Sequence, residues 1–594
     1  MRKQSKENEL DKVRHSTAHL LAMAVLEKFP KTKLGIGPTV KNGFSYDFDF
    51  VKKNEQLKPD DLMTFEKRIR ELIKKDLKFK KEFVSFAEAK KLFKGQTYKL
   101  DLLKGLNKSK KKISIYKTYE QTKNQKLKTK NYFVDLCAGP HVSSTKEINS
   151  DAFKLMSLAG AYWRGDEMQP MLTRIYGTAF GTKKELDEYL KMMEEAEKRD
   201  HKKLGLKMEL FMFHETAPGI PYWLPKGLVI LNELIGFWRE EHDKRGYQEI
   251  QAPLLNKKEL YEISGHWEHY RENMFISKTG ENEIYALKPM NCPNAMVIFG
   301  SKSRSYRELP LRLSDTDRLH RYELSGTLSG LFRAREFSQD DAHIFISEDQ
   351  VKDEYLRILD IAKRFYSIFK IDYSFRLGTR PKEFMGDIKT WNRAEKELKE
   401  ILERTGKSYS VEPGDGAFYG PKIDILMKDS LGRDWQMGTI QLDFQIPKRF
   451  NLKYTDKNGK EKTPVVIHRV IYGSLERFLG ILIEHFAGAL PVWLAPVQVE
   501  IINVGSAHKN YAREIYSRLL ENNIRASISD DNLTVSKRIR EAEIQKIPYI
   551  LVVGDKEKSA GTVSERGRSG KDYGQIKIEN FILNIRKEIE EKVI

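Results

Sequence analysis

An almost wholly charged stretch at Lys183–Gly205 (KKELDEYLKMMEEAEKRDHKKLG) constrains this chain more than any other feature. A helix that is polar on every face has no side to bury, so it stands in solvent between separately folded parts. We therefore expect a linker helix over residues 183–206. At about 150 residues per domain, the 594 residues of the chain have room for three to five domains.

The composition excludes several classes of protein. Hydrophobic residues make up 40% of the chain and aromatic residues 11%. This content excludes a disordered protein, because disordered chains have too little apolar surface to bury. Two cysteines exclude a disulfide framework and a zinc ribbon built on four cysteines. No apolar core follows the charged N-terminus, and Glu484 and His485 interrupt the most apolar window, Phe478–Val497. We expect a soluble, cytoplasmic protein without a membrane span.

The charge balance points to a polyanionic partner but leaves a second explanation open. There are 105 Lys and Arg residues against 85 Asp and Glu residues, so the formal net charge is +20. Nucleic acid attracts such a chain. A proteome rich in lysine gives similar totals without any nucleic-acid partner.

Periodicity predicts the first elements. Apolar residues recur at helical spacing over Lys12–Phe29, aromatic and polar residues alternate over Gly43–Phe50, and an amphipathic helix is predicted over Pro59–Lys75. Leu102–Asn131 holds ten lysines and one acid, which favours an exposed, mobile insertion before a strand at Tyr132–Leu136.

The composition changes after the linker. Residues 208–493 are rich in Gly, Pro and aromatic residues, and they include strand-like KIDILM (Lys422–Met427). In the last part, apolar runs such as YILVVGD alternate with predicted helices at Ala507–Leu520 and Val535–Ile544. This alternation indicates a compact α/β domain of about 100 residues.

The middle segment lacks the Gly-rich fingerprints that hold phosphate in many nucleotide-binding proteins. Arginine is the other good phosphate ligand, because its planar guanidinium binds oxygens in pairs and stays charged. Three stretches carry suitable arginines: RGYQEIQAPLL (Arg245–Leu255), LHRYELSGTLSGLFRAREFSQDDAHIF (Leu319–Phe345) and IYGSLERFLGILIEHF (Ile471–Phe486).

Together and in this order, these stretches resemble the three signature motifs of class II aminoacyl-tRNA synthetases. The resemblance implies an antiparallel sheet flanked by helices and a bent ATP, used with Mg²⁺. Arg321 would hold the α-phosphate, Glu323 the adenine amino group and Arg477 the γ-phosphate, and Phe337 would stack on adenine. Arg333 belongs to the same catalytic set. The alternative is that these arginines are surface ion-pair partners.

Cys292 in LKPMNCPNAM, His343 in QDDAHIF and His468 in VVIHRVIYGSLERF lie too far apart in sequence for a compact metal motif. Each alone is compatible with a packed core residue. The surrounding stretches, with GDGAFYGPKIDI and WQMGTIQLDF, are similar to the threonyl-tRNA synthetase family over nearly the whole chain. That resemblance implies one Zn²⁺ per subunit on these three residues.

Three protein ligands leave zinc positions open for substrate. Threonine supplies an amine and a hydroxyl, whereas isosteric valine lacks the hydroxyl, and an apolar pocket would separate the two only about 100-fold. The resemblance places Asp341 on the threonine hydroxyl, with Gln339 and Tyr419 completing the pocket. His266 matches a histidine proposed to help activate the tRNA 2′-hydroxyl. The family usually has Gly-His where this chain has Asn294 and Ala295.

Zinc does not exclude serine, so such an enzyme needs a second, hydrolytic site. Four residues near the N-terminus by themselves suggest a tetrahedral zinc site, and that alternative stays open: His15, His19, Cys137 and His141. The resemblance implies instead a metal-free editing pocket with Lys99 and Asp135, in which an imidazole or lysine positions water. The family often has Arg at the position of Ala138.

Further expectations follow from the same resemblance. The N-terminal ubiquitin-like domain of many bacterial relatives is expected to be lacking. The run Lys104–Lys130 lies where the acceptor end of tRNA would arrive. Asn532, Glu557 and Arg566 would read the anticodon by base-edge hydrogen bonds and stacking; a polar turn and a phosphate contact are the alternative.

The sequence thus predicts an α+β multidomain chain. Its parts are an editing domain (1–182), a linker helix (183–206), an antiparallel-sheet class II catalytic domain (207–493) and an α/β anticodon-binding domain (494–594). It would use ATP and L-threonine, charge tRNA(Thr), edit seryl-tRNA(Thr) and form a homodimer. A catalytically silent RNA-binding paralogue and a prolyl or seryl synthetase are the alternatives.

Overall fold

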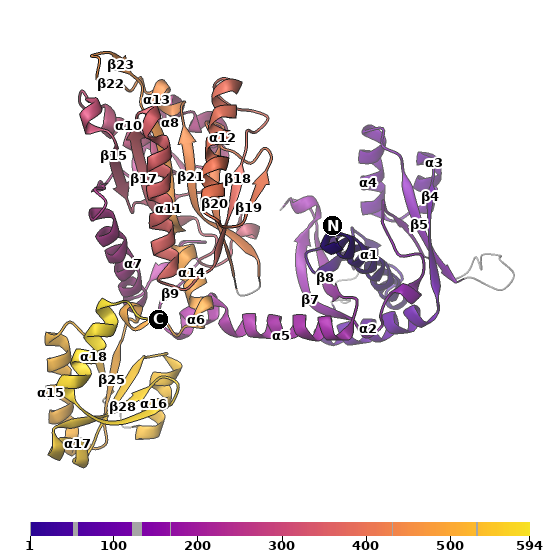
Figure 1. The fold of residues 1–594 in the computed structure, drawn as a ribbon. Coiled ribbons are helices and arrows are strands. Elements are labelled where there is room, and N and C mark those ends of the chain that lie inside the picture. Colours follow the sequence, from indigo (N-terminus) through magenta and orange to yellow (C-terminus); the bar gives the residue numbers. More distant parts are fainter. Residues whose placement is uncertain (1, 51–56, 121–132, 167, 430–431, 530–532) are drawn as a thin grey trace. The chain divides into compact units, whose positions relative to one another are not determined.

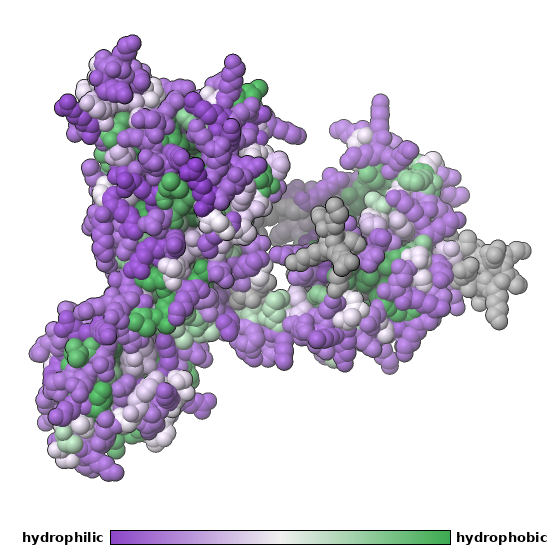
Figure 2. All heavy atoms as spheres, in the orientation of Figure 1, coloured by the Kyte–Doolittle hydropathy of each residue, from purple (hydrophilic) through white to green (hydrophobic). Residues whose placement is uncertain are grey.

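The computed structural model describes residues 2–50, 57–120, 133–166, 168–429, 432–529 and 533–594. It divides into two compact units, Met1–Glu194 and Glu195–Ile594 (Figure 1). The face drawn in Figure 2 is mainly hydrophilic on each unit. No helix among the described residues is long and apolar enough to cross a membrane.

A five-stranded antiparallel sheet forms the centre of the first unit, in the order β1-β3-β8-β7 with β2 beside β3. Leu20, Leu21 and Val25 of the first helix are fully buried in one core with Phe44 and Phe48, which confirms the predicted helical and strand periodicities. The elements are α1 (Arg2–Lys28), β1 (Lys33–Leu34), β2 (Thr39–Val40), β3 (Gly43–Asp49), α2 (Pro59–Lys74), β7 (Phe153–Tyr162) and β8 (Met171–Ala179).

A second, three-stranded sheet in the same unit has the order β4-β5-β6. Two helices, α3 and α4, contribute to its core of Ala89, Phe93, Leu103, Ile113 and Ile115. The elements are β4 (Leu77–Phe83), α3 (Phe86–Leu92), α4 (Thr97–Lys108), β5 (Ser114–Glu120) and β6 (Phe133–Leu136).

The prediction of an exposed, mobile insertion over Leu102–Asn131 is wrong for its first part. Those residues continue α4 to Lys108 and then form β5. Leu103, Ile113 and Ile115 are buried, while Lys104 and the lysines from 108 to 112 stay exposed. A lysine count hides this pattern, because buried apolar residues such as Leu103 and Ile113 stand among the exposed lysines. Residues 121–131, with the other lysines of the run except Lys117 of β5, lie outside the described residues.

The charged stretch forms two helices, α5 (Lys183–Arg199) and α6 (His201–Lys207), and not one. Asp200 separates them, because its carboxylate accepts a hydrogen bond from the backbone N–H of Lys202 at 2.8 Å and so caps the second helix. His201 and Gly205 of α6 are buried, so the prediction of a solvated linker is wrong for this part of the stretch.

A nine-stranded sheet forms the centre of the second unit. Its strand order is β11-β15-β17-β24-β21-β20-β18-β19, with β16 beside β17, and only the two edge pairs, β11–β15 and β18–β19, are parallel. The strands are β11 (Gln248–Glu249), β15 (Leu311–Asp315), β16 (Arg318–His320), β17 (Glu336–Ile346), β18 (Tyr373–Gly378), β19 (Tyr409–Glu412), β20 (Lys422–Lys428), β21 (Asp434–Asp443) and β24 (Val465–Ser474). The predicted antiparallel core is confirmed.

Long helices pack their apolar faces on this sheet. They are α7 (Pro225–Asp243), α11 (Val351–Ser367), α12 (Ile388–Arg404) and α14 (Leu475–His485). Helix α14 begins at Leu475 with Ser474 as its N-cap. Smaller elements precede or join them: β9 (Phe211–Met212), β10 (Tyr222–Trp223), β12 (Leu255–Lys257), α8 (Lys258–Ser264), α9 (His266–His269), β13 (Ile276–Lys278), β14 (Ile284–Leu287), α10 (Cys292–Gly300), α13 (Ile446–Arg449), β22 (Tyr454–Thr455) and β23 (Glu461–Lys462).

The C-terminal part has its own mixed sheet in the order β26-β25-β27-β28-β29, in which the first three strands are parallel. Its core includes Val499, Ile501, Leu519, Leu551 and Phe581. The elements are β25 (Val499–Asn503), α15 (Lys509–Glu521), β26 (Ala526–Ser529), α16 (Val535–Ile544), β27 (Tyr549–Val553), α17 (Asp555–Ala560), β28 (Thr562–Gly567), β29 (Asp572–Lys577) and α18 (Ile578–Glu590). The predicted α/β alternation is confirmed.

Candidate active sites

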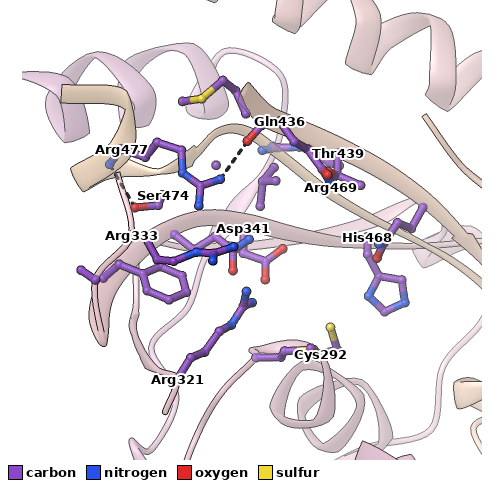
Figure 3. A pocket seen from close by; sticks show the side chains of 18 of the residues that line it. Cys292, Arg321, Arg333, Asp341, Gln436, Thr439, His468, Arg469, Ser474 and Arg477 are labelled. Carbon is purple, nitrogen blue, oxygen red and sulfur yellow. Dashed lines mark hydrogen bonds between the residues drawn. The ribbon is translucent and has the colours of Figure 1, made fainter. Parts of the chain in front are cut away.

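A cavity of about 320 Å³ opens on the sheet of the second unit (Figure 3). Strands β17, β21 and β24, the segment 321–334 and the start of α14 contribute its lining. Ten predicted site residues lie in that lining: Cys292, Arg321, Glu323, Arg333, Phe337, Gln339, Asp341, Tyr419, His468 and Arg477.

Three arginines extend into one end of the cavity from different segments (Figure 3). Arg477 is held by its Nε, which donates to the Phe332 carbonyl at 2.9 Å, and by an NH1 bond to the Gln436 carbonyl at 3.0 Å. Burial, together with the charges of Arg321 and Arg333, lowers the pKa of Arg477 to about 10. Guanidinium groups that repel one another in this way favour a bound polyanion such as a phosphate chain.

An aromatic surface lies beside these cations. The ring centroid of Phe337 is 4.9 Å from the Arg321 guanidinium carbon, and Arg321 Nε donates to the Pro289 carbonyl at 3.2 Å. The Glu323 carboxylate lies 3.8 Å from Arg333 Nε. A flat apolar face, a carboxylate and several guanidinium groups together suit a nucleotide.

The other end of the cavity is polar and more enclosed. Asp341 is buried, with its pKa raised to about 6 by burial against the opposing effect of His468 and Arg469. Tyr419 is also buried, and its hydroxyl donates to Gln441 Oε1 at 2.5 Å. Gln339 is on the same strand as Asp341 and also faces the cavity.

Cys292, His343 and His468 meet at this polar end. Antiparallel pairing of β17 with β24 sets His343 directly opposite His468, so both side chains leave the same face of the sheet. Cys292 begins α10, and one potential ligand atom from each of the three residues lies within 4.8 Å of the others. Sequence distances of 51 and 125 residues hid this cluster, because strand register creates it.

The donor set of this cluster fits a zinc ion. His343 is fully buried, yet neither of its ring nitrogens has a hydrogen-bond partner among the residues that the structure describes. His468 Nδ1 also has none, while its Nε2 lies 2.9 Å from Asp443 Oδ2. A carboxylate on the far ring nitrogen is the usual support of a metal-binding histidine. A thiol and two such imidazoles are ligands that zinc prefers.

The first unit assembles the four residues for which a second zinc site was the alternative. His15 and His19 lie one turn apart on α1, and Cys137 and His141 follow β6. Cys137 Sγ is 3.3 Å from His15 Nε2 and 3.3 Å from His141 Nε2. Local groups occupy the other ring nitrogens: the Pro140 carbonyl contacts His15 Nδ1 at 3.1 Å, and the Ser16 hydroxyl contacts His141 Nδ1 at 3.0 Å.

A buried network of charged and polar groups adjoins these four residues. Lys99 Nζ lies 2.5 Å from Asp135 Oδ1, and the Tyr46 hydroxyl donates to Asp135 Oδ2 at 2.5 Å. His19 Nε2 is 3.4 Å from the same oxygen. Lys99, Asp135 and His19 are at most 2% exposed, so the network is held firmly around the histidines.

Burial keeps the imidazoles of this cluster neutral. It lowers the pKa of His15, and it lowers the pKa values of His19 and His141 much further, with help from the charges of neighbouring groups. The same burial raises the pKa of Cys137 to about 12, so its thiol stays protonated. Neutral imidazoles beside a buried lysine can accept a proton from water, whereas the thiol is no nucleophile.

Three family patterns match separate parts of the chain. The "tRNA synthetase class II core domain (G, H, P, S and T)" covers residues 275–486, the "Anticodon binding domain" residues 498–588, and the "Threonyl and Alanyl tRNA synthetase second additional domain" residues 113–176. The chain is 49% identical to threonine–tRNA ligase of Carboxydothermus hydrogenoformans, over 98% of this chain and 89% of that protein. The chain belongs to the threonyl-tRNA synthetase family. The predicted resemblance is confirmed.

Other members of the threonyl-tRNA synthetase family agree. The threonine–tRNA ligase of Thermotoga maritima is 49% identical over 97% of this chain and 88% of that protein. The crystal structure of the RNA-binding domain of the Cryptosporidium parvum threonyl-tRNA synthetase matches with a TM-score of 0.63 and 40% identity, over 66% of this chain and 98% of that one. The crystal structure of the putative threonyl-tRNA synthetase ThrRS-1 from Aeropyrum pernix matches with a TM-score of 0.59 and 29% identity, over 66% of this chain and 97% of that one.

Two of the three predicted anticodon residues lie near each other along the C-terminal sheet. Glu557 of α17 accepts hydrogen bonds from the Gly554 N–H at 3.0 Å and from Gln575 at 2.8 Å. Arg566 of β28 donates to Asp572 at 2.8 Å. The alternative of a polar turn at Glu557 is wrong as a description of its local structure, which is helical. Asn532 lies outside the described residues.

Neither His266 nor His343 is among the residues that line the cavity, and His266 lies apart from the predicted zinc ligands' cluster. It is 1% exposed, its Nδ1 contacts the Ser264 hydroxyl at 2.8 Å, and its Nε2 lies 3.1 Å from Met290 Sδ. Burial lowers its pKa to about 4. Met290 itself lines the cavity, so the imidazole is one side chain behind it.

The departures from the family pattern also have definite surroundings. Asn294 is buried in α10, where its side-chain N–H₂ has no partner, and Ala295 packs in the core with Met296. The carbonyl of Ala138 accepts a hydrogen bond from Lys81 at 2.7 Å, so a cation reaches this position from β4.

Sequence reasoning missed Gln441 and Tyr46. Thr439 and Gln441 lie two residues apart on β21 and both line the cavity, next to Met437. This period of two was available in the motif WQMGTIQLDF. Tyr46 carried no signal of its own, because its contact with Asp135 depends on how two distant strands meet.

Proposed function

We propose that the chain activates L-threonine with ATP, transfers it to tRNA(Thr) and hydrolyses mischarged seryl-tRNA(Thr). As a member of the threonyl-tRNA synthetase family it is a threonine–tRNA ligase with a class II core and an editing domain. The observation that supports the residue assignments is the polar end of the cavity. There the Cys292 thiol and the rings of His343 and His468, three of whose four nitrogens have no hydrogen-bond partner among the described residues, adjoin a pocket for a nucleotide.

The arginine end of the cavity holds ATP. Arg321 neutralises the α-phosphate on which the threonine carboxylate attacks, and Arg477 and Arg333 bind the leaving diphosphate with Mg²⁺. Phe337 stacks on the adenine, and the Glu323 carboxylate accepts from its amino group. Backbone carbonyls hold Arg321 and Arg477, so these two groups need little reorganisation as charge develops.

The polar end selects threonine. Cys292, His343 and His468 hold one Zn²⁺, which when bound supplies a Lewis acid for the amine and hydroxyl of threonine. Asp341 accepts a hydrogen bond from the substrate hydroxyl, and Gln339 and Tyr419 close the pocket. Valine offers the buried Asp341 carboxylate no hydroxyl, and the loss of that hydrogen bond costs about 1–3 kcal/mol, or more when the acceptor is charged.

Transfer to tRNA uses the same cavity. We retain for His266 the assistance to the tRNA 2′-hydroxyl, and its position behind Met290 requires that side chain to move aside. The C-terminal domain reads the anticodon with Asn532, Glu557 and Arg566. Two copies of the chain form the active homodimer, and it works in the cytoplasm.

The first unit removes serine. The neutral imidazole of His15, whose pKa is the least lowered of the three, takes a proton from water as the water attacks the seryl ester and returns it to the departing ribose oxygen of the tRNA, while Lys99 stabilises the developing charge. Asp135 and the Tyr46 hydroxyl hold Lys99 in place. We assign no metal to this site, in keeping with the metal-free editing pocket that the family resemblance implies, although one potential ligand atom from each of the four residues lies within 4.8 Å of the others.

Amino-acid-dependent ATP–diphosphate exchange tests this proposal. We expect exchange with threonine, weaker exchange with serine and little with valine or proline. If none of the amino acids supports exchange, the silent RNA-binding alternative is favoured. A preference for proline or serine would favour the other synthetases of the same class.

A further inference from the structure

His201 is buried at the first turn of α6, although it belongs to the charged stretch that sequence reasoning placed in solvent. Its Nδ1 lies 2.9 Å from the Oε1 of Glu484, a residue of α14 that is itself 6% exposed. Asp200 caps α6 immediately before His201. Such complete burial of a histidine and a glutamate indicates a specific structural or functional task.

The other ring nitrogen reaches the wall of the ATP cavity. The backbone N–H of Leu331 donates to His201 Nε2 at 3.2 Å. Because Nε2 accepts, the proton of the neutral ring is on Nδ1 and is donated to Glu484. A directed chain of hydrogen bonds therefore runs from the Leu331 N–H through His201 to Glu484.

The imidazole also packs directly on the segment 330–332. Gly330 has φ +54°, and a Cβ atom there would lie 2.6 Å from His201 Nε2. The ring of Phe332 is 4.2 Å from the imidazole, centroid to centroid. Leu331 and Phe332 are both at most 2% exposed and both line the cavity.

This segment in turn holds the arginines. The Phe332 carbonyl accepts the hydrogen bond from Arg477 Nε at 2.9 Å, and Arg333, the next residue, extends into the cavity. The position of residues 330–332 therefore sets the carbonyl that holds the Arg477 guanidinium and the backbone from which Arg333 extends. His201 is the polar contact from α6 that fixes this segment.

We propose that His201 is a positioning residue of the ATP site: it holds the segment 330–332, and through it Arg333 and Arg477, in the arrangement that binds the triphosphate. This inference rests on the proposed function, since it takes the arginine end of the cavity to be the ATP site. His201 contacts no substrate and acts only through the backbone it supports.

The substitution His201→Phe keeps a ring against Phe332 and removes both hydrogen bonds. An unsatisfied buried N–H weakens the segment, and we expect the KM for ATP in threonine-dependent exchange to rise about tenfold. The KM for threonine, zinc content and seryl-tRNA hydrolysis stay at their wild-type values. A merely structural role would lower all activities together. Glu484→Gln keeps an acceptor for the His201 Nδ1–H, so its KM for ATP should stay near the wild-type value. Glu484→Leu removes the acceptor and should raise that KM.

A second pair of variants leaves α6 and α14 unchanged. Gly330→Ala places a methyl group against His201 and strains a backbone with positive φ, so it should also raise the KM for ATP about tenfold. Gly459→Ala is the matched control, because Gly459 also has a positive φ of +75° and a Cβ there meets no described atom within 4 Å. The proposal is overturned if folded His201→Phe or Gly330→Ala keeps the wild-type KM for ATP. Absence of threonine-dependent exchange in the wild type would instead overturn the proposed function, and this inference with it.

Discussion

Asp135→Asn is a sharp test of the buried network in the first unit. Asp135 and Lys99 are 2% and 1% exposed, and their charged atoms are 2.5 Å apart. Removing one charge leaves Lys99 buried without its counter-ion, which costs about 3–5 kcal/mol. For a unit of this size, 1 kcal/mol lowers Tm by about 2–4 °C, so we expect the unfolding transition of the first unit to fall by about 6–20 °C.

Differential scanning calorimetry of the full chain measures this shift. The second unit has its own core, so its transition should stay in place. The double variant Lys99→Met/Asp135→Leu removes both charges, and because no lone charge stays buried it should lose less stability than Asp135→Asn alone. A shift of the first transition below about 2 °C, or a larger loss in the double variant, would refute this reasoning.

The remaining predictions concern editing, pH and ATP binding. His19→Ala should leave threonine activation intact and let seryl-tRNA accumulate; unchanged hydrolysis of seryl-tRNA in that variant contradicts the assignment. The pKa values of His15, His19 and His141 are lowered in the folded state from the ordinary 6.5, so below that pH the unfolded chain binds more protons and the first unit should lose stability as the pH falls. Calorimetry between pH 7.5 and 5 checks this, and a transition that rises on acidification would be the wrong sign. Arg477→Lys cannot keep both backbone hydrogen bonds and should lower kcat/KM for ATP about 100-fold, as steady-state exchange kinetics will show; a loss of less than about threefold means that Arg477 does not bind phosphate.

Local pattern predicted much of the fold. Helix α16 lies at Val535–Ile544, as its periodicity indicates, and β3 ends one residue before the predicted Phe50. The predictions were wrong where a high content of charged residues was taken as evidence of exposure. The lysines near α4 and β5 concealed a buried face, and the charged stretch concealed His201, because both helices carry a few buried residues among many exposed ones.

The candidate sites were predictable only in part. The motif containing Arg321 and Glu323 supplies cavity residues within a short stretch, so sequence order carries the information. His343 and His468 meet through strand register, and only the family resemblance could associate them with Cys292. The contact of Gln441 with Tyr419 depends on how β21 meets a distant loop, and spacing along the chain does not encode it.

The assignment of zinc to the second unit can be tested directly. The chain has two cysteines, and only Cys292 belongs to the proposed zinc site, so Cys137 serves as the matched control. The measurement is the zinc content of purified wild-type, Cys292→Ala and Cys137→Ala chains, determined together with threonine-dependent ATP–diphosphate exchange. The account predicts one zinc per chain in the wild type and in Cys137→Ala, with exchange in both, and loss of zinc and of exchange in Cys292→Ala. Full exchange in a Cys292→Ala chain without zinc, or loss of zinc in Cys137→Ala alone, would contradict it.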